Sequence, residues 1–90
     1  MPERWFLYVL LCSDGTYYTG ITTSLERRLK EHNTSARGAK YTKTRRPVKL
    51  IYFEDYDDRS SAQKAECQFK KLTRKRKEMV INEDGRFGKT

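Results

Sequence analysis

Residues 5–22 read WFLYVLLCSDGTYYTGIT, and this segment determines which architecture the chain can form. Its first eight residues are an unbroken apolar run, which is typical of a short strand buried on both faces. Turn-forming residues follow at 13–15, and residues 16–22 are rich in Thr and Tyr, which favour strands. The segment therefore predicts a β-hairpin with strands at 5–12 and 16–22.

The length of the hairpin loop decides where two tyrosines lie. A two-residue loop would place Tyr8 and Tyr18 on opposite faces of the hairpin. A three-residue loop, with Gly15 as the left-handed residue of a bulge, would place Tyr8 opposite Gly20 and both tyrosines on one face. We predict the three-residue loop, because Asp14 favours the start of a turn and Gly15 adopts positive φ without strain.

The rest of the chain shows helical and strand patterns in alternation. Thr23-Ser24-Leu25-Glu26 has the form of a capping box, which indicates that a helix begins at Ser24. The expected elements after the hairpin are a helix from Ser24 to Asn33, a basic loop over 34–46, a strand over 47–54, a helix from Ser60 to Leu72 and a helix over 73–82. The last helix should dock on the core through Met79, Val80 and Ile81. The order is β-β-α-β-α-α, which predicts an α/β (α+β) fold: a small, three-stranded, mostly antiparallel sheet flanked by three helices.

Ninety residues are enough for one hydrophobic core. We expect residues 1–82 to form one domain and the Gly-rich, charged segment 83–90 to be a flexible C-terminal tail. No apolar run approaches the roughly 18 residues of a membrane span, and the N-terminus lacks the features of a signal peptide. A cytoplasmic location is expected. Cys12 and Cys67 are interpreted as reduced packing residues.

The charge of the chain points to a polyanionic partner. Twenty Lys and Arg against twelve Asp and Glu give a net charge of +8. The basic residues are concentrated: residues 37–46 contain five and no acid, and residues 70–77 contain six in eight positions. Nucleic acid fits this pattern better than a membrane, because no Trp/Phe-rich amphipathic face accompanies it. A generically basic protein with solvated faces is the alternative.

A carboxylate in an apolar stripe is the strongest sign of a functional site. Glu66 lies within the stripe that Ala62, Ala65 and Phe69 form on the expected helix. Burying a carboxylate costs free energy unless the group is paired or binds a metal. Two interpretations stay open on spacing alone: an ion pair with Arg28, or a ligand for a divalent cation.

Three other residue types near the expected core could carry chemistry. Arg28 lies at the edge of a helical face and could bind phosphate oxygens through its forked guanidinium. His32, one turn later, is more often a hydrogen-bonded core histidine than a functional one. Tyr8 and Tyr18 are more often packing residues. A phenol that acts as a base near neutral pH would need its pKa of about 10 to fall by about three units, or about 4 kcal/mol.

These residues together resemble the GIY-YIG nuclease domain. The first motif corresponds to Phe6-Leu7-Tyr8 and the second to Tyr18-Thr19-Gly20. The arginine ten residues after the second tyrosine corresponds to Arg28, the histidine to His32 and the helical glutamate to Glu66. Phe, Leu and Thr replace the Gly and Ile residues of the family name, and these are strand positions without a chemical role. The resemblance covers about residues 4–80.

The resemblance extends to the small stand-alone bacterial (UPF0213-like) members, which share the loop Gly38-Ala39-Lys40-Tyr41. It implies a metal-dependent endonuclease that hydrolyses DNA phosphodiester bonds with low sequence specificity, in DNA repair or recombination. The DNA would be branched or single-stranded, and the protein a monomer. Two alternatives stay open: a catalytically weak module that binds DNA or RNA on the nuclease scaffold, and an interaction domain for an acidic protein.

The resemblance also implies a role for each site residue. Glu66 would bind one Mg²⁺ or Mn²⁺, and Tyr8 would accept a proton from the attacking water. Arg28 would stabilise charge on the phosphate, Tyr18 would orient the phosphate or the water, and His32 would support Tyr8 or the water. The residues expected to hold the nucleic-acid backbone are Lys40, Tyr41, Lys43, Arg45, Arg46, Lys70, Lys71 and Arg74.

Overall fold

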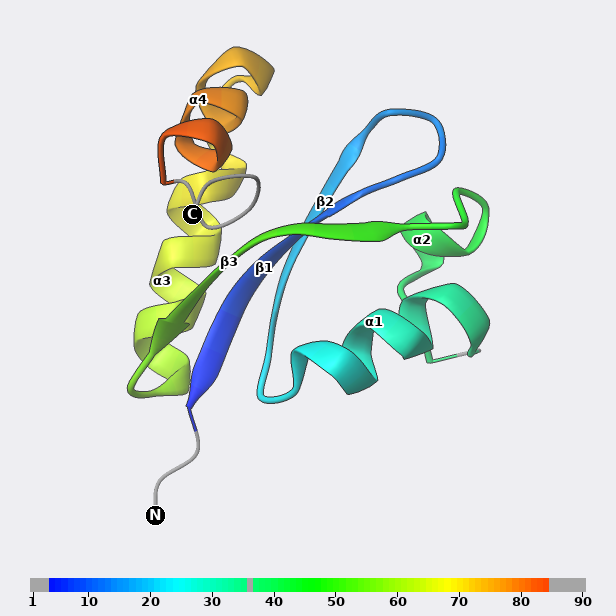
Figure 1. The fold of residues 1–90 in the computed structure, drawn as a ribbon. Helices are drawn as coiled ribbons and strands as arrows, with labels where there is room; N and C mark the ends of the chain where they lie inside the picture. Colours follow the sequence, from blue (N-terminus) through cyan, green and yellow to red (C-terminus); the bar gives the residue numbers. More distant parts are fainter. Residues whose placement is uncertain (1–3, 36, 85–90) are drawn as a thin grey trace.

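The computed structural model describes residues 4–35 and 37–84. Its centre is an antiparallel three-stranded sheet in the order β2-β1-β3 (Figure 1). The strands are β1 (Trp5–Leu11), β2 (Tyr17–Thr22) and β3 (Lys49–Tyr56). The middle strand is thus the apolar run of the hairpin, as a strand buried on both faces must be.

Helices cover both faces of this sheet. They are α1 (Leu25–Thr34), α2 (Lys40–Lys43), α3 (Arg59–Lys70) and α4 (Arg74–Asp84). Figure 1 shows α1 and α2 on one side of the sheet and α3 and α4 on the other. The predicted fold class is confirmed, with the one-turn helix α2 added inside the segment expected to be a loop. The helix α4 runs two residues into the expected tail, and the rest of that tail lies outside the described residues.

The three-residue hairpin loop is confirmed. Tyr8 pairs with Gly20 and Leu10 with Tyr18, so both tyrosines lie on one face of the hairpin. Gly15 has a φ of 86°, the left-handed conformation that glycine adopts without strain. The register therefore follows from the chemistry of a single turn.

Alternate residues of β1 build two separate cores. Leu7 and Val9 face α3 and α4, where they pack with Tyr52, Phe69 and Ile81. Tyr8 and Leu10 face the other side, where a second cluster also includes Cys12, Val48, Tyr18, Leu25 and Leu29. This period of two explains the unbroken apolar run, because each face of the strand needs its own apolar residues.

Side-chain caps fix the starts of two helices. Ser24 caps α1, and its hydroxyl accepts a hydrogen bond from the backbone N–H of Arg27 at 3.3 Å. The expected capping box does not form with this cap, because Glu26 stands one position before the third residue of the helix, where the box requires an acid. Asp58 caps α3 through the N–H of Ser61 at 2.8 Å, so the helix begins ahead of the predicted Ser60.

Two other boundaries differ from the sequence prediction. The strand β3 continues to Tyr56, and α3 ends at Lys70 rather than Leu72. Of the residues expected to dock α4, Ile81 is buried and Val80 is half-buried, whereas Met79 is exposed.

No helix in the described ranges is long and apolar enough to cross a membrane.

The position of β2 matters for the site. It is the outer strand of the sheet on that side and pairs only with β1. Side chains from the α1 face and from the α3 face can therefore approach one another around this edge. The helix α3 packs against β1 and β2, which brings the helix that carries Glu66 to the edge.

Candidate active site

The Tyr8 side chain is buried beneath a glycine of the edge strand. Its phenol is 2% exposed and lies against Gly20, its partner in the hairpin. A Cβ atom at Gly20 would lie 2.5 Å from the Tyr8 hydroxyl oxygen and 2.7 Å from Cζ. Because real Cβ atoms do not approach other atoms so closely, the glycine creates the space that the phenol occupies.

The substitution Gly20→Ala should therefore destabilise the protein by about 1–3 kcal/mol, the usual effect of overpacking a core. Urea unfolding of the variant and the wild type measures the difference. In a Tyr8→Leu background the same substitution should cost much less, because the phenol that it displaces is gone. Equal costs in the two backgrounds would show that Gly20 is not there to accommodate Tyr8.

A chain of hydrogen bonds leads from Tyr8 into the protein. The Tyr8 hydroxyl lies 2.8 Å from Nε2 of His32, and Nδ1 of His32 lies 2.8 Å from Oγ1 of Thr42. The Thr42 hydroxyl donates to the carbonyl of Ala39 at 2.9 Å. Since this uses its single proton, Nδ1–H of His32 donates to Thr42, and Nε2 accepts from Tyr8. The competing contact, from the Ala39 N–H to Nδ1, is longer at 3.4 Å.

His32 is neutral at physiological pH. Its side chain is fully buried, and burial together with the positive charge of Arg28 lowers its pKa from 6.5 to about 4. The neutral ring keeps a lone pair on Nε2 toward Tyr8. His32 is thus both a hydrogen-bonded core histidine and a proton acceptor beside the phenol.

The burial of neutral His32 should make the protein less stable in mild acid. An unfolded chain binds a proton on this histidine near pH 6.5, whereas the folded protein binds it only near pH 4. The contribution of neutral His32 to the free energy of unfolding is therefore fully present above pH 6.5, and it is lost as the pH falls toward 4. Urea unfolding should show a loss of about 2 kcal/mol from pH 7 to pH 5. His32 is the one histidine in the chain, so His32→Gln should remove this loss. If the His32→Gln variant still loses this stability between pH 7 and pH 5, His32 is not the source of the loss.

The phenol of Tyr8 is protonated and resists ionisation. Burial raises its pKa to about 12, with a smaller contribution from the negative charge of Glu66, although the Arg28 guanidinium beside it acts in the opposite direction. For Tyr8 to act as a free base near neutral pH this pKa would have to fall, and it rises instead. The cause is the burial of the phenol, with its hydroxyl against Gly20, which the spacing of residues could not reveal.

Tyr18 lies beside both partners of this hydrogen bond. The centre of its ring is 6.4 Å from that of Tyr8 and 5.1 Å from that of His32. On its other side it stacks with Tyr41 of α2, at 6.0 Å and an interplanar angle of 27°. The predicted sharing of one face is confirmed, and Tyr18 links the buried site to the protein surface.

Arg28 is half-buried and held by a neighbour that the sequence analysis did not single out. It donates to the Glu31 carboxylate at 2.9 Å and to the Arg37 carbonyl at 2.8 Å. The first open alternative, an ion pair between Arg28 and Glu66, is therefore not what the structure contains. Glu31 lies three residues on, at the spacing that joins helical neighbours, so this signal was present in the sequence.

Glu66 is close enough to Tyr8 for its charge to raise the phenol pKa, although it belongs to a helix on the opposite side of the sheet. Its carboxylate is 20% exposed and lies 3.2 Å from Nζ of Lys70, one turn further along α3. This ion pair is half-exposed and contributes little stability. Glu66 is thus available to another cation.

The donor set at Glu66 fits a hydrated cation better than a protein-enclosed one. Within the described ranges no three His, Cys, Asp or Glu side chains form a group that could hold a metal ion. Mg²⁺ is often held by one or two carboxylates, with water and substrate phosphate completing its shell. A single half-buried carboxylate beside a basic surface is consistent with that mode.

The arginines expected to hold nucleic acid also make contacts within the protein. Arg46 donates to the His32 carbonyl at 2.6 Å and the Ser35 carbonyl at 2.7 Å, at the C-terminal end of α1. Arg45 binds the Asp14 carboxylate at 2.9 Å and lies over the ring of Tyr41. Arg74 donates to the Gly15 carbonyl and lies over the ring of Tyr17. Their binding to phosphate stays a prediction, whereas Lys40, Lys43, Lys70 and Lys71 are exposed.

Thr42 and Ala39 are the site residues that the sequence analysis missed. Thr42 is fully buried and orients His32 through its hydroxyl, and it is the buried residue of α2. In the sequence, Thr42 is a threonine in a basic segment without apolar periodicity. That pattern does not show whether the hydroxyl is buried or on the surface.

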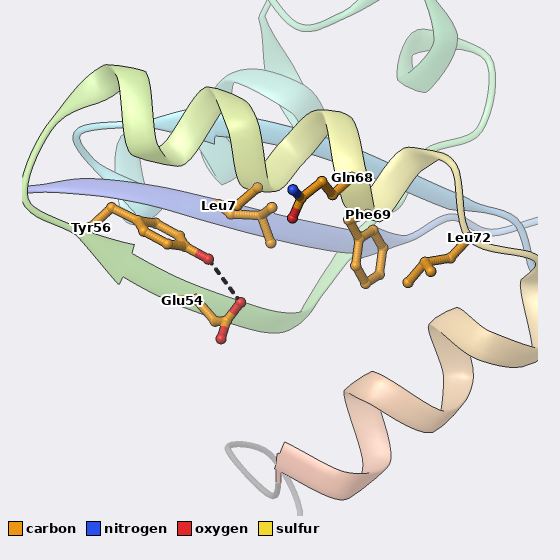
Figure 2. A pocket seen from close by; sticks show the side chains of 7 residues that line it. Leu7, Glu54, Tyr56, Gln68, Phe69 and Leu72 are labelled. Carbon is orange, nitrogen blue, oxygen red and sulfur yellow. Dashed lines mark hydrogen bonds between the residues drawn. The ribbon is translucent and has the colours of Figure 1, made fainter.

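The surface of residues 4–35 and 37–84 includes two hollows of similar size. One, of about 220 Å³, adjoins Tyr18 and is lined by Tyr17, Tyr18, Thr19, Tyr41, Lys70 and Lys77. The other, of about 250 Å³, lies between β3 and α3 and contains none of the predicted site residues (Figure 2). In this second hollow Tyr56 donates to Glu54 at 3.1 Å, and Leu7 points into it from the face of β1 opposite Tyr8. Of the predicted site residues, Tyr18, Tyr41 and Lys70 therefore line the first hollow, and none lines the second.

Comparison with known proteins identifies the domain. The family model described as the GIY-YIG catalytic domain matches residues 4–79. The chain belongs to the GIY-YIG family. The match spans the hairpin, α1 and the helix that carries Glu66, and it confirms the resemblance inferred from the motifs. The domain is of a nuclease-like kind.

Bacterial UPF0213 proteins are similar to the chain over most of their length. UPF0213 protein lin0209 of Listeria innocua is 58% identical over 78 residues, which is 87% of this chain and 86% of that protein. UPF0213 protein DP2720 of Desulfotalea psychrophila is 54% identical over 77 residues, or 86% and 70%. The solution NMR structure of EF2693 from E. faecalis has a TM-score of 0.64 at 52% identity and covers 91% of this chain and 86% of that one. A similar fold is thus present in a protein of related sequence.

Proposed function

We propose that the protein is a metal-dependent endonuclease that hydrolyses DNA phosphodiester bonds with low sequence specificity, in DNA repair or recombination. The observation that carries this proposal is the convergence around the edge of β2. The charges of both Arg28 and Glu66 are close enough to Tyr8 to affect its pKa, and the Tyr8 hydroxyl forms a hydrogen bond with His32. A basic, aromatic hollow adjoins them. A binding module has no need of a carboxylate at the place where phosphate would lie.

Glu66 would hold one Mg²⁺ or Mn²⁺, which would supply electrostatic stabilisation of the phosphate and the leaving oxygen when bound. Lys70 balances the charge of this carboxylate in the absence of other cations. Arg28 would bind the developing negative charge through the N–H groups that Glu31 and the Arg37 carbonyl do not occupy. Tyr18 would orient the phosphate or the attacking water from the mouth of the site.

The raised pKa of Tyr8 defines how its proton can move. Forming a free phenolate at pH 7 from a group with a pKa of about 12 costs about 7 kcal/mol. Tyr8 would avoid this cost by passing its own proton to Nε2 of His32 while it accepts one from water. The Nδ1–H bond to Thr42 would then stabilise the resulting imidazolium. His32 therefore acts through Tyr8 in this proposal.

The basic side chains around the hollow would hold the nucleic-acid backbone without reading its sequence. These are Lys40, Tyr41, Lys43, Arg45, Arg46, Lys70, Lys71 and Arg74. Contacts of this kind position a strand by its phosphates and do not depend on the bases. We therefore expect the protein to cleave DNA of many different sequences.

A second candidate function is a nucleic-acid binding module, for DNA or RNA, that retains the scaffold. The high pKa of Tyr8 favours it, because a phenol that resists ionisation predicts slow chemistry. This function requires salt-sensitive binding without metal-dependent cutting.

A cleavage assay separates the two. Purified protein is incubated with branched, single-stranded and duplex DNA of matched length, with Mg²⁺, with Mn²⁺ or with EDTA. The proposal predicts cutting that requires the metal and decreases as salt increases. Binding to all three substrates without cutting in either metal would support the module and contradict hydrolysis.

A further inference from the structure

The hollow at the edge of β2 has features that the hydrolytic site does not need. Because consecutive strand residues point to opposite faces, Tyr17 and Tyr18 reach it from the two sides of β2. Tyr41 of α2 forms another part of its lining, and Lys70 and Lys77 approach from α3 and α4. The hollow thus gathers three aromatic rings and two ammonium groups from four separate elements.

The aromatic lining is held in place by cations. Tyr18 and Tyr41 stack on one another, and the Arg45 guanidinium lies 3.8 Å from the centre of the Tyr41 ring. Likewise, the Arg74 guanidinium lies 3.7 Å from the centre of the Tyr17 ring. Tyr41 is nevertheless 38% exposed, which is unusual for a large aromatic side chain. The part of the Tyr41 ring that Arg45 and Tyr18 leave exposed is suited to offset or edge contact with a flat ring.

The chemistry of the lining selects among ligands. Stacking surfaces beside a positively charged groove are how proteins bind single-stranded nucleic acid, since every base has a π-face. Lys70 and Lys77 would bind the phosphates next to that base. A base inside a duplex is stacked between its neighbours and paired, so it cannot enter a hollow.

We propose that this hollow is a stacking subsite for one unpaired base of a single-stranded DNA segment, next to the Tyr8–Glu66 site. The proposal rests on the proposed function for its choice of DNA. It adds that the enzyme recognises an unpaired nucleotide beside the bond it cuts. The residues that it assigns to base binding are Tyr17, Tyr18 and Tyr41, with Lys70 and Lys77 on the flanking phosphates.

The test compares ligands that differ only in their bases. Glu66→Gln protein in EDTA is titrated with a 12-nucleotide thymidine strand and with a fully abasic backbone of the same length and charge, and affinity is measured by fluorescence anisotropy. Stacking predicts that the thymidine strand binds about tenfold more tightly. Adding Tyr41→Leu should bring that ratio close to one. A 12-base-pair duplex should bind equally to the two proteins.

A charge variant provides the control. Lys64 is exposed on α3 and does not line the hollow, so Lys64→Gln should leave the ratio near ten. A ratio near one in the parent protein, or a ratio of ten that survives Tyr41→Leu, would overturn the subsite. Metal-dependent cutting together with a ratio near one would overturn the subsite and leave hydrolysis intact. A Tyr41-dependent ratio of ten without cutting would support the subsite and contradict hydrolysis.

Discussion

Replacing Glu66 by glutamine should slow metal-dependent cutting by about 100- to 1,000-fold and leave DNA affinity equal or higher. Losing one electrostatic stabiliser of a developing charge has an effect of this size. Glu66 is the carboxylate whose charge reaches Tyr8, and Gln keeps its shape while removing the charge that a cation needs. Binding improves because a negative charge no longer faces the phosphate. Single-turnover cleavage gives the rate, and anisotropy in EDTA gives the affinity.

The matched control is Glu78→Gln. Glu78 forms the same kind of ion pair on α4, with Arg74 four residues earlier at 3.2 Å. It differs from Glu66 in having no place in the proposed site. Its cutting rate should stay within about twofold of the wild type, as is usual for exposed pairs. Equal rates for the wild type and Glu66→Gln would remove Glu66 from the mechanism.

The second large effect is expected from Tyr8→Phe. The substitution removes the hydroxyl that would transfer a proton to Nε2 of His32, and general-base contributions are typically about 100- to 10,000-fold. It also leaves Nε2 buried without a donor, which should cost about 1–3 kcal/mol of stability. Single-turnover rates and urea unfolding measure the two effects separately.

Tyr52→Phe distinguishes chemistry from packing. Tyr52 is as buried as Tyr8 but belongs to the core on the other face of the sheet. Its loss of a hydroxyl can reduce stability but should leave the cutting rate unchanged. If Tyr8→Phe cuts as fast as Tyr52→Phe, the hydroxyl of Tyr8 is structural and the proton path through His32 is wrong.

Much of the fold could be predicted because local chemistry and global pattern agree. The turn around Asp14 and Gly15 specifies one hairpin register, and that register places Tyr8 beside Gly20 and on the face of Tyr18. The apolar run before it is long enough to be buried on both sides, which makes β1 the central strand. These inferences use only neighbours in sequence or residues paired across one turn.

The rest of the site depends on contacts between distant segments. The short helix α2 has no apolar periodicity, so Thr42 could not be recognised as the partner of His32. Arg28 pairs with Glu31, three residues on in the same helix, whereas Glu66 belongs to α3 on the other side of the sheet. The rise in the Tyr8 pKa comes from tertiary enclosure, which spacing does not measure.

The central claim is that Tyr8, Tyr18, Arg28 and Glu66 surround the binding position of one cation at the edge of β2. Titration of ¹⁵N-labelled protein with Mn²⁺ tests it directly, because the ion broadens the signals of nearby amides. Broadening should begin at Tyr8, Tyr18, Gly20 and Glu66, and Glu66→Gln should abolish it. Broadening confined to the acidic segment 54–58, or unchanged in Glu66→Gln, would contradict the account.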